Sequence, residues 1–226
     1  MAIDKIALLF DIDGTLIITD GAGATSWKLA FKDLYGIPAD IDAYSDTGMT
    51  DPEVARRTFT AVMGHNPSAG EFSRLLERRM HFLGRAVAEA GGYRILPGVE
   101  ALLPDLIERG YLLGLVTGNL EGAAHIKLAR AGLNRFFAFG GYGSDSPDRA
   151  ALTKVAMARA CLVAGEEIAP EQFLAFGDTP NDVEAAHSVG IECVAVASHK
   201  YTFEQLSDAG ADWVLNSFEE AIPLER

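Results

Sequence analysis

The chain has little cysteine, and it has no long run of apolar residues. Its two cysteines, Cys161 and Cys193, are far apart and form no C-x-x-C pair, so we expect buried thiols in a reduced cytoplasm and no disulfide framework. No stretch approaches the roughly 18 apolar residues that a membrane span needs. Asp4 interrupts the N-terminal segment, so we expect no signal peptide. These absences predict a cytoplasmic protein that does not contact a membrane.

Positive charge is also scarce. Lysine and arginine number 19 against 32 aspartates and glutamates, which gives a formal net charge of -13. Nucleic acids and anionic membranes repel such a surface, so we expect neither as a partner. An anionic substrate would have to bind against this overall field, although salt screens the field beyond roughly 8 to 10 Å. A bound cation is the simplest local remedy.

What the chain does have is apolar material. Of its 226 residues 49% are hydrophobic and 23% are charged, which is enough to bury a core and argues against global disorder. This length fits one large domain, or a core with an inserted subdomain.

Short apolar runs alternate with helical patterns through the second half of the chain. Alternation with short links predicts an α/β fold, in which a Rossmann-like parallel sheet is covered by helices on both faces. We expect strands at 6–10, 112–116, 137–143, 173–177, 191–197 and 212–215, and helices at 121–132, 147–165, 179–190 and 203–210.

The segment between the first strand and Leu96 has a different pattern. Its hydrophobic periodicity predicts helices at 21–37, 51–64 and 71–92, and no convincing strand separates these helices. Its longest apolar stripe comprises Phe72, Leu75, Leu76, Arg79, Leu83, Ala86 and Val87 and follows i, i+3, i+4 spacing, which is typical of packing within a helical bundle. We therefore predict an inserted all-helical cap at 19–92 and a catalytic core formed by 1–18 and 93–226.

Polar residues follow three of the predicted strands at the points where the strands end. Ligands of open parallel sheets bind outside the carboxyl ends of the strands, so adjacent strands would bring these residues together. The residues are Asp11, Asp13, Thr117, Gly118, Asn119, Asp178 and Asp182. So many close carboxylates cannot all ionise without a partner. Because these residues offer oxygen ligands, we expect a hard cation there. Mg²⁺ suits a site that also holds a phosphate.

Each of these motifs has a structural alternative. A D-x-D-G sequence occurs in calcium loops. Such a loop usually has an Asp or Asn at position five, a glycine at position six and a Glu at position twelve, and this chain has Thr15, Leu16 and Ala22 there. The T-G-N sequence is common in ordinary loops, and Asp178 and Asp182 fit the first turn of a helix. All three motifs in this order, each at a strand end, favour one functional site.

The motifs DIDGTL, VTGN, DR and GDTPND resemble the four motifs of the haloacid dehalogenase-like hydrolases, and the helical insert resembles the cap of the phosphoglycolate-phosphatase-like and β-phosphoglucomutase-like branch. The resemblance implies that Asp11 attacks phosphorus and that Asp13 is the general acid and base. It implies that Thr117 and the backbone of Gly118 and Asn119 bind the phosphoryl group. Mg²⁺ would be held by Asp11, Asp13 through its carbonyl, Asp178 and Asp182.

The third motif departs from the common family pattern. Most members have a lysine before a proline, whereas this chain reads SDSPDRAALTK. We favour Arg149 for the cationic role because it stands at the start of the predicted helix. Lys154, more than one turn later, is the alternative.

The predicted cap loop at 46–53 also departs from the pattern, because Met49 stands where an arginine is common. The resemblance implies that this loop, including Thr50, contacts the substrate. The change at Met49 argues against a second strongly anionic group bound at this place. Arg56 and Arg57 are alternative sources of that charge, but a solvated helix face explains them more simply.

We therefore predict a Mg²⁺-dependent phosphatase that hydrolyses a small phosphorylated metabolite through an aspartyl phosphate, as a monomer or a homodimer. A phosphomutase of the same fold is the alternative. A 2-haloacid dehalogenase would have no use for the acid Asp13, and a phosphonate-cleaving enzyme would need a Schiff-base lysine such as Lys28 or Lys32. A non-catalytic binding protein would normally have lost Asp11 or Asp13.

Overall fold

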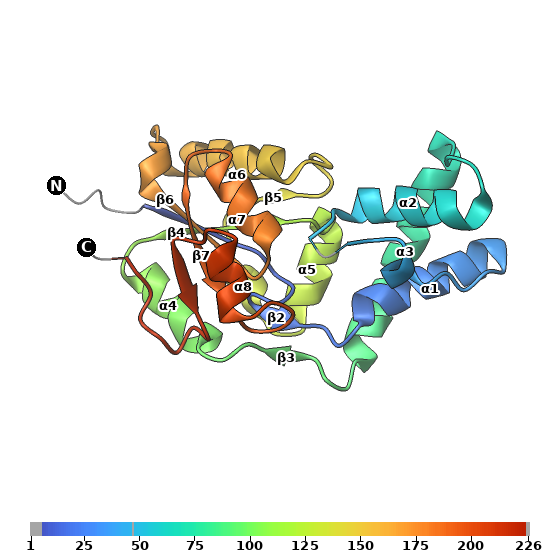
Figure 1. Cartoon of the computed structure of the whole chain (residues 1–226), viewed down its shortest axis with the longest axis horizontal. Helices are drawn as coiled ribbons and strands as arrows, with labels where there is room; N and C mark the ends of the chain where they lie inside the picture. Colours follow the sequence, from blue (N-terminus) through green and yellow to red (C-terminus); the bar gives the residue numbers. More distant parts are fainter. Residues whose placement is uncertain (1–5, 47, 225–226) are drawn as a thin grey trace.

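The structure is a computed structural model that describes residues 6–46 and 48–224. Asp4, and Thr47 within the predicted cap loop, lie outside the described residues. An α/β core and a helical cap lie side by side along the long axis of the molecule (Figure 1). Among the described residues, no helix combines the length and the apolar character that crossing a membrane requires.

The core is built on a six-stranded sheet in which every neighbouring pair is parallel, and this confirms the predicted α/β fold class. The strands lie in the order β5-β4-β1-β6-β7-β8. Their bounds are β1 Ala7–Phe10, β4 Leu112–Thr117, β5 Phe139–Tyr142, β6 Phe173–Gly177, β7 Glu192–Val196 and β8 Trp213–Leu215. Phe10 of the central strand pairs with Leu115 on one side and Phe176 on the other. The three strands that carry the polar motifs are therefore adjacent and in register at their carboxyl ends.

Helices cover both faces of the sheet, because alternate strand residues point to opposite sides. Leu8 and Phe10 pack with α4 and α5, whereas Ala7 and Leu9 pack with α6, α7 and α8. The bounds of the core helices and 3₁₀ turns are α4 Val99–Glu108, α5 Glu121–Ala129, η2 Leu133–Phe136, α6 Arg149–Ala164, η3 Pro170–Gln172, α7 Pro180–His187 and α8 Phe203–Asp208.

The sequence analysis assigned no element to α4, which forms although it contains Pro104. Proline and glycine near this segment are typical of loops. Leu103 and Leu106 are fully buried against the sheet, so tertiary packing offsets the weak local preference. The antiparallel pair β2 (Ile17–Ile18) and β3 (Arg94–Ile95) also went unpredicted, because two residues are too few for a periodic pattern.

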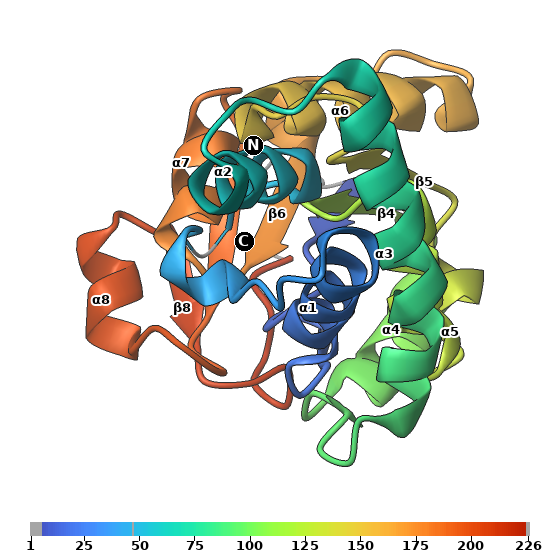
Figure 2. The same ribbon diagram turned by 90° about the vertical axis from the view of Figure 1, so that its right-hand side faces the viewer.

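Three helices and a 3₁₀ turn form the cap within the described part of the chain, and Figure 2 shows the helices in front of the sheet. Their bounds are α1 Ala22–Tyr35, η1 Ile41–Ala43, α2 Asp51–Met63 and α3 Ala69–Glu89. Trp27, Phe31, Phe59 and Leu75 are buried between these elements and form a small core of their own. The β2–β3 pair lies where the chain enters and leaves the cap, close to the predicted limits at 19 and 92, which remain a prediction.

Several contacts fasten the cap to the core at this junction. Asp20 has a left-handed backbone with φ of 52°, and its carboxylate accepts a hydrogen bond from Gly92 N at 2.8 Å. Arg130, which directly follows the core helix α5, donates to the carbonyls of Val87 and Ala90 at the end of α3. The C-terminal end of α3 is thus fastened to the core.

Substitution of Gly141 tests how closely the sheet and its covering helix pack, and Gly84 in the cap helix α3 serves as the control. A Cβ at Gly141 in β5 would lie 2.0 Å from the carbonyl oxygen of Leu152 in α6, whereas a Cβ at Gly84 in α3 would meet nothing within 4 Å. Gly141→Ala should lower the free energy of unfolding by about 1–3 kcal/mol through overpacking. Gly84→Ala should raise it by about 0.5–1 kcal/mol, because alanine is the better helix former. Urea titrations followed by circular dichroism measure both changes. Equal effects of the two substitutions would contradict the packing described.

Candidate active site

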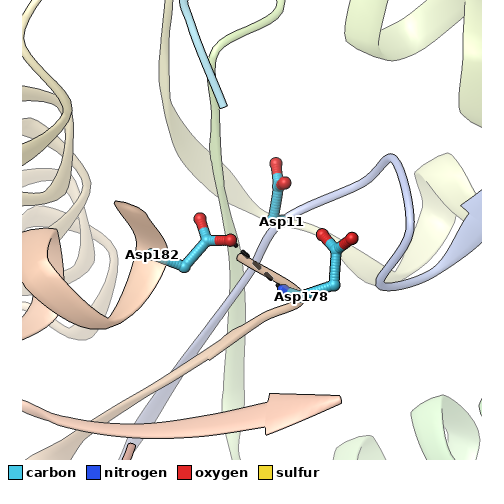
Figure 3. Close-up of side chains that lie close together, drawn as sticks. All are labelled: Asp11, Asp178 and Asp182. Carbon is cyan, nitrogen blue, oxygen red and sulfur yellow. Dashed lines mark hydrogen bonds between the residues drawn. The ribbon is translucent and has the colours of Figure 1, made fainter. Parts of the chain in front are cut away.

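Three buried aspartates converge at the carboxyl ends of β1 and β6 (Figure 3). Asp11 directly follows β1, Asp178 directly follows β6, and Asp182 lies in the first turn of α7. Each offers a carboxylate oxygen, and these oxygens lie within 4.8 Å of one another. The structure thus brings together three of the four predicted metal-binding residues through their side chains.

The close approach perturbs the ionisation of this group. Burial raises the pKa of Asp11 to about 6, with further repulsion from Asp182 and Asp13 and with Arg149 acting in the opposite direction. The pKa of Asp178 is also raised well above its usual value, first by burial and then by Asp182 and Asp11. Buried like charges of this kind call for a cation. An all-oxygen donor set fits a hard divalent ion such as Mg²⁺.

Arg149 is the cation that this chain itself places in the group. It begins α6, and its guanidinium hydrogen-bonds to Asp182 Oδ1 and lies 3.3 Å from Asp11 Oδ2. Burial alone would lower the pKa of this guanidinium, but the carboxylates of Asp182 and Asp11 raise it. The competing candidate Lys154 is exposed on the same helix. The geometry supports Arg149 in the cationic role.

Asp182 also shapes the loop that carries Asp178. Its Oδ2 accepts hydrogen bonds from the backbone of Asp178 at 3.2 Å and Thr179 at 3.0 Å, and from the Thr179 hydroxyl at 2.7 Å. This is a capping box at the start of α7. The structural interpretation of Asp182 as a first-turn residue is therefore correct, and its other oxygen, Oδ1, accepts the hydrogen bond from Arg149.

The turn after β1 depends on Gly14. Its φ is +86°, and a Cβ there would lie 2.1 Å from Asp178 Oδ2. Only glycine allows the turn to pass this close to the carboxylate. Next to it, Thr15 donates to Asp178 Oδ1 at 3.4 Å, a contact that the sequence analysis did not assign.

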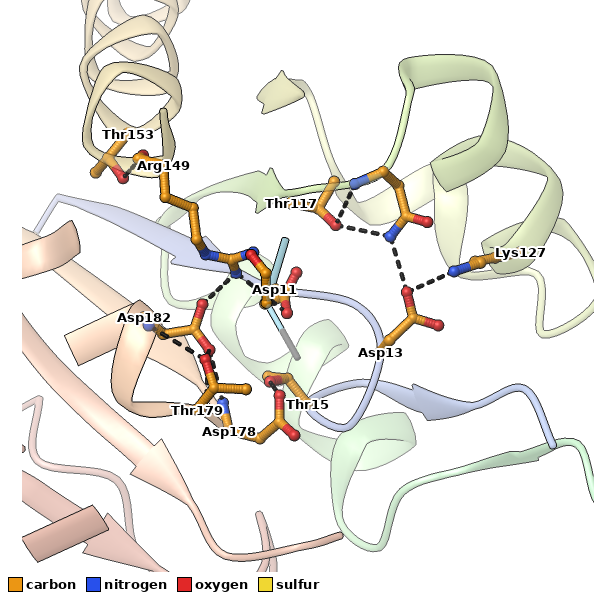
Figure 4. Close-up of polar contacts among 12 residues, drawn as sticks. Asp11, Asp13, Thr15, Thr117, Lys127, Arg149, Thr153, Asp178, Thr179 and Asp182 are labelled. Carbon is orange, nitrogen blue, oxygen red and sulfur yellow. Dashed lines mark hydrogen bonds and ion pairs between the residues drawn. The ribbon is translucent and has the colours of Figure 1, made fainter. Parts of the chain in front are cut away.

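Asp13 points away from the carboxylate cluster (Figure 4). Its Oδ2 accepts hydrogen bonds from Lys127 Nζ at 2.6 Å and Asn119 Nδ2 at 2.8 Å, and its Oδ1 lies 3.5 Å from the Thr19 hydroxyl. Burial acts to raise the pKa of Asp13, but the charge of Lys127 and the hydrogen bonds from Lys127 and Asn119 hold it below its usual value. The side chain of Asp13 is thus on the side of the site that does not hold Asp178.

The predicted phosphate-binding residues end β4 beside these carboxylates. Thr117 is fully buried, and its hydroxyl accepts hydrogen bonds from Asn119 through both the backbone N at 3.3 Å and Nδ2 at 2.8 Å. Asn119 therefore joins Thr117 to Asp13 by one amide group. A Cβ at Gly118 would lie 2.6 Å from the carbonyl oxygen of Met49, which shows how closely the cap loop approaches.

The cap loop is docked on the core through Asp51. Its backbone N donates to Gly118 O at 2.7 Å, and its Oδ2 accepts from Leu120 N at 2.8 Å. Gly48 O accepts from Arg149 Nη1 at 3.2 Å. Thr50 is buried at the start of α2, and its hydroxyl has no hydrogen-bond partner among the described residues. The structure is thus a closed arrangement of cap and core.

A cavity of about 180 Å³ lies between cap and core. Its polar lining includes Asp11, Asp13, Asp51, Arg79, Thr117, Asn119, Lys127 and Arg149, and its apolar lining includes Trp27, Ile41, Met49 and Val54. Drug-sized ligands occupy roughly 300–1,000 Å³, so this space suits a much smaller molecule.

The model of the haloacid dehalogenase-like hydrolase family matches residues 7–190. The chain belongs to this family. It is 29% identical over 212 residues to a phosphoglycolate phosphatase of Synechococcus elongatus, covering 93% of this chain and 92% of the relative. It is 31% identical over 226 residues to a phosphoglycolate phosphatase of Rhodospirillum rubrum, covering 94% and 87%. A crystal structure of a predicted phosphoglycolate phosphatase from Haemophilus somnus has the same fold, with a TM-score of 0.72, 23% identity and 95% of each chain covered.

The family assignment confirms the predicted family and the predicted enzyme class, a phosphoric monoester hydrolase of the haloacid dehalogenase-like hydrolases. The roles of individual residues remain predictions. Sequence reasoning missed Lys127, Arg79 and Asp51 at the site. The sequence could have indicated Arg79, because it is a charged residue within the apolar stripe of α3. Lys127 likewise interrupts the inward face of α5, next to buried Leu128.

Replacing one carboxylate of the cluster should weaken metal binding while the protein still folds. About a hundredfold excess of Mg²⁺ over its Kd should add about 2.7 kcal/mol to the free energy of unfolding of the wild type. Asp178→Asn should lose most of this gain. Without metal the variant should melt above the wild type, because one of the mutually repelling charges is gone. Thermal unfolding with Mg²⁺ or EDTA measures both effects. The surface variant Asp105→Asn should keep the wild-type response, and the same response in Asp178→Asn would contradict the assignment.

Proposed function

We propose that the chain is a Mg²⁺-dependent phosphatase that acts in the cytoplasm on a small phosphorylated metabolite and forms an aspartyl phosphate at Asp11. The observation that carries the proposal is the position of Asp11. It stands at the end of the central strand, within 4.8 Å of two more carboxylates and 3.3 Å from the Arg149 guanidinium. This arrangement supplies both a carboxylate nucleophile and the positive charge that an anionic ester needs to approach it.

Asp11 and Asp178 would hold the metal with the backbone carbonyl of Asp13, and Asp182 lies close enough to be a further ligand. When bound, Mg²⁺ supplies positive charge that lessens the repulsion between the Asp11 carboxylate and the phosphoryl oxygens. Thr15 and the capping box of Asp182 fix the orientation of Asp178. These neighbours keep the donor oxygens in place before the substrate arrives.

The reaction proceeds in two steps. In the first, a carboxylate oxygen of Asp11 forms a bond to phosphorus, and the bond from phosphorus to the ester oxygen breaks. Asp13, which takes up a proton from solvent when it turns away from Lys127, gives that proton to the ester oxygen. In the second, Asp13 takes a proton from a water molecule, which attacks phosphorus and releases inorganic phosphate from Asp11. Splitting the hydrolysis in this way replaces one slow step by two easier ones.

Arg149 and the loop after β4 bind the phosphoryl oxygens in this scheme. The guanidinium already lies between Asp11 and Asp182, so it can stabilise charge as the new bond forms. Thr117 donates its hydroxyl, and Gly118 and Asn119 offer backbone N–H groups. The cap loop with Thr50 closes the cavity and excludes bulk water.

The relatives point to a first substrate to test. Both relatives compared above are phosphoglycolate phosphatases, and 2-phosphoglycolate is small enough for the cavity between cap and core. Their names also favour hydrolysis over the phosphomutase and dehalogenase alternatives.

A phosphatase assay with the nucleophile removed tests the proposal. The wild type should release phosphate from 2-phosphoglycolate and from p-nitrophenyl phosphate with Mg²⁺ and lose this activity in EDTA. Asp11→Asn should be at least about 10³-fold slower, because an amide cannot form the phosphoenzyme. Intact-mass spectrometry should detect a phosphorylated adduct of the wild type after a rapid acid quench. Metal-independent turnover, or full activity of Asp11→Asn, would reject the mechanism.

A matched pair of cationic variants tests the third motif. Arg149→Ala should lower kcat by about two to three orders of magnitude, which corresponds to losing about 3–4 kcal/mol of charge stabilisation in the transition state. Lys154→Ala removes the same charge from an exposed position of α6 and should change kcat little. Steady-state kinetics with saturating Mg²⁺ distinguish the two, and the opposite ranking would overturn the role of Arg149.

A further inference from the structure

We propose that Arg149 also fastens the cap loop to the core through the carbonyl of Gly48, so that the cation which binds the phosphoryl group also holds the loop docked over it. The phosphoryl contact in this inference rests on the proposed phosphatase function. The new element is conformational, because it makes the Gly48 carbonyl a positioning group for Arg149 and makes Arg149 a docking partner of the cap.

The guanidinium of Arg149 is divided between the two parts of the molecule. Its Nη1 donates to Gly48 O of the cap loop at 3.2 Å. Its Nη2 hydrogen-bonds to Asp182 Oδ1 and lies 3.3 Å from Asp11 Oδ2, and both of these carboxylates belong to the core (Figure 4). The side chain is 10% exposed, so little water competes for these contacts. One planar group therefore joins the cap loop to the carboxylate cluster.

Arginine can make both contacts because its donors form a rigid fork. Each Nη atom carries two N–H groups, so the bond to Gly48 leaves one of those on Nη1 for a phosphoryl oxygen. The ammonium group of a lysine, by contrast, is a single nitrogen. A lysine that stayed beside the carboxylates would leave the Gly48 carbonyl without this donor. The departure of this chain from the common third motif is thus what adds the contact with the cap.

Gly48 allows the cap loop to come close enough for this bond. Its φ is +85°, and a Cβ there would lie 2.7 Å from Nδ2 and 3.2 Å from Cβ of Asn181, at the start of α7. Any other residue at this position would be strained by its own backbone and would also press against α7. The Gly48 carbonyl reaches Arg149 because no side chain holds the loop away from the core.

The cap loop crosses the site between two sets of core contacts. Gly48 lies against the starts of α6 and α7, and three residues later Asp51 bonds to the loop after β4. Because β1 lies between β4 and β6 in the sheet, residues 48–51 pass over the end of the strand that precedes Asp11. The contact with Arg149 holds one end of this crossing segment, and the contacts of Asp51 hold the other.

The bond between Arg149 and Gly48 also lies in the wall between two cavities. Gly48, Met49 and Arg149 line the cavity of about 180 Å³ that contains Asp11, and they also line a second cavity of about 540 Å³ between α2, α6 and α7. Release of Gly48 from Arg149 would join the two spaces and open a path towards Asp11. The bond that positions the guanidinium would therefore also limit access to the nucleophile.

Hydrogen exchange of two backbone amides measures whether the cap loop is docked. Asp51 N donates to Gly118 O and Leu120 N donates to Asp51 Oδ2, so both bonds exist only in the docked state. Exchange is followed by mass spectrometry at single-residue resolution, with Mg²⁺ and without substrate. Arg149→Lys and Arg149→Met should both accelerate exchange of these amides at least about tenfold, because both lose a charge-assisted bond to Gly48. If Arg149 acted through its charge alone, Arg149→Lys would keep the wild-type rates.

A matched pair of glycine variants tests the same contact from the side of the cap. Gly48 and Gly64 both have a left-handed backbone, with φ of +85° and +75°, but a Cβ at Gly64 would meet nothing within 4 Å. Gly48→Ala should accelerate exchange as Arg149→Lys does. It should also lower kcat at least about tenfold, the usual scale for a lost positioning partner, although every side chain assigned to the reaction remains. Gly64→Ala should keep the wild-type exchange rates and kcat.

The double variant Arg149→Lys/Gly48→Ala shows whether the two residues act through one contact. Its amides should exchange no more than about threefold faster than those of the faster single variant, because the same bond is lost in all three proteins. Independent effects would multiply instead.

Two results would overturn the inference. They are wild-type exchange rates of the two amides in Arg149→Lys or Gly48→Ala, and multiplied effects in the double variant. If Gly48→Ala does not fold, the comparison of Arg149→Lys with Arg149→Met decides alone. Equal acceleration in both then supports the inference, and acceleration in Arg149→Met only rejects it. Because exchange needs no turnover, an inactive wild type would reject the proposed phosphatase and leave the docking result unaffected.

Discussion

The repulsion among Asp11, Asp178 and Asp182 is the constraint on which the rest of the site depends. The parallel register of β1 and β6 places the first two side by side at the sheet edge, and the first turn of α7 adds the third. Burial makes their mutual repulsion strong, and the raised pKa values of Asp11 and Asp178 record it. Each unusual feature nearby answers this repulsion. Arg149 brings positive charge, the capping box satisfies one carboxylate, and the remaining oxygens are donors that a hard cation would need.

Local placement of cations outweighs the overall charge of the chain. A net charge of -13 disfavours an anionic substrate at long range. Yet three of the cations line one small cavity, where the exclusion of water strengthens their effect. Two of them belong to the core and one to the cap. The anion-binding ability of the site therefore depends on cap and core being together, which composition alone does not reveal.

Much of the core was predictable because its signals are local and repeated. Short apolar runs gave the strands of the sheet, and Asp11, Thr117 and Asp178 could be placed at one edge from their positions after these runs. The helix α4 was missed because Pro104 and the neighbouring glycine weaken its local pattern, while the burial of Leu103 is a tertiary effect. Lys127 was missed for a related reason. A lysine within a helix is ordinarily solvated, and only the packing of α5 against the turn after β1 brings it to Asp13.

Asp51 links the docked cap loop both to the core and to Arg79, a cation that lines the cavity. One carboxylate oxygen binds Leu120 N of the core and Arg79 of the cap at once, each at 2.8 Å. If the cap loop moves away, Asp51 loses its core contact, while Arg79 stays with its helix. Any ligand whose binding requires the docked loop would therefore also stabilise the closed state.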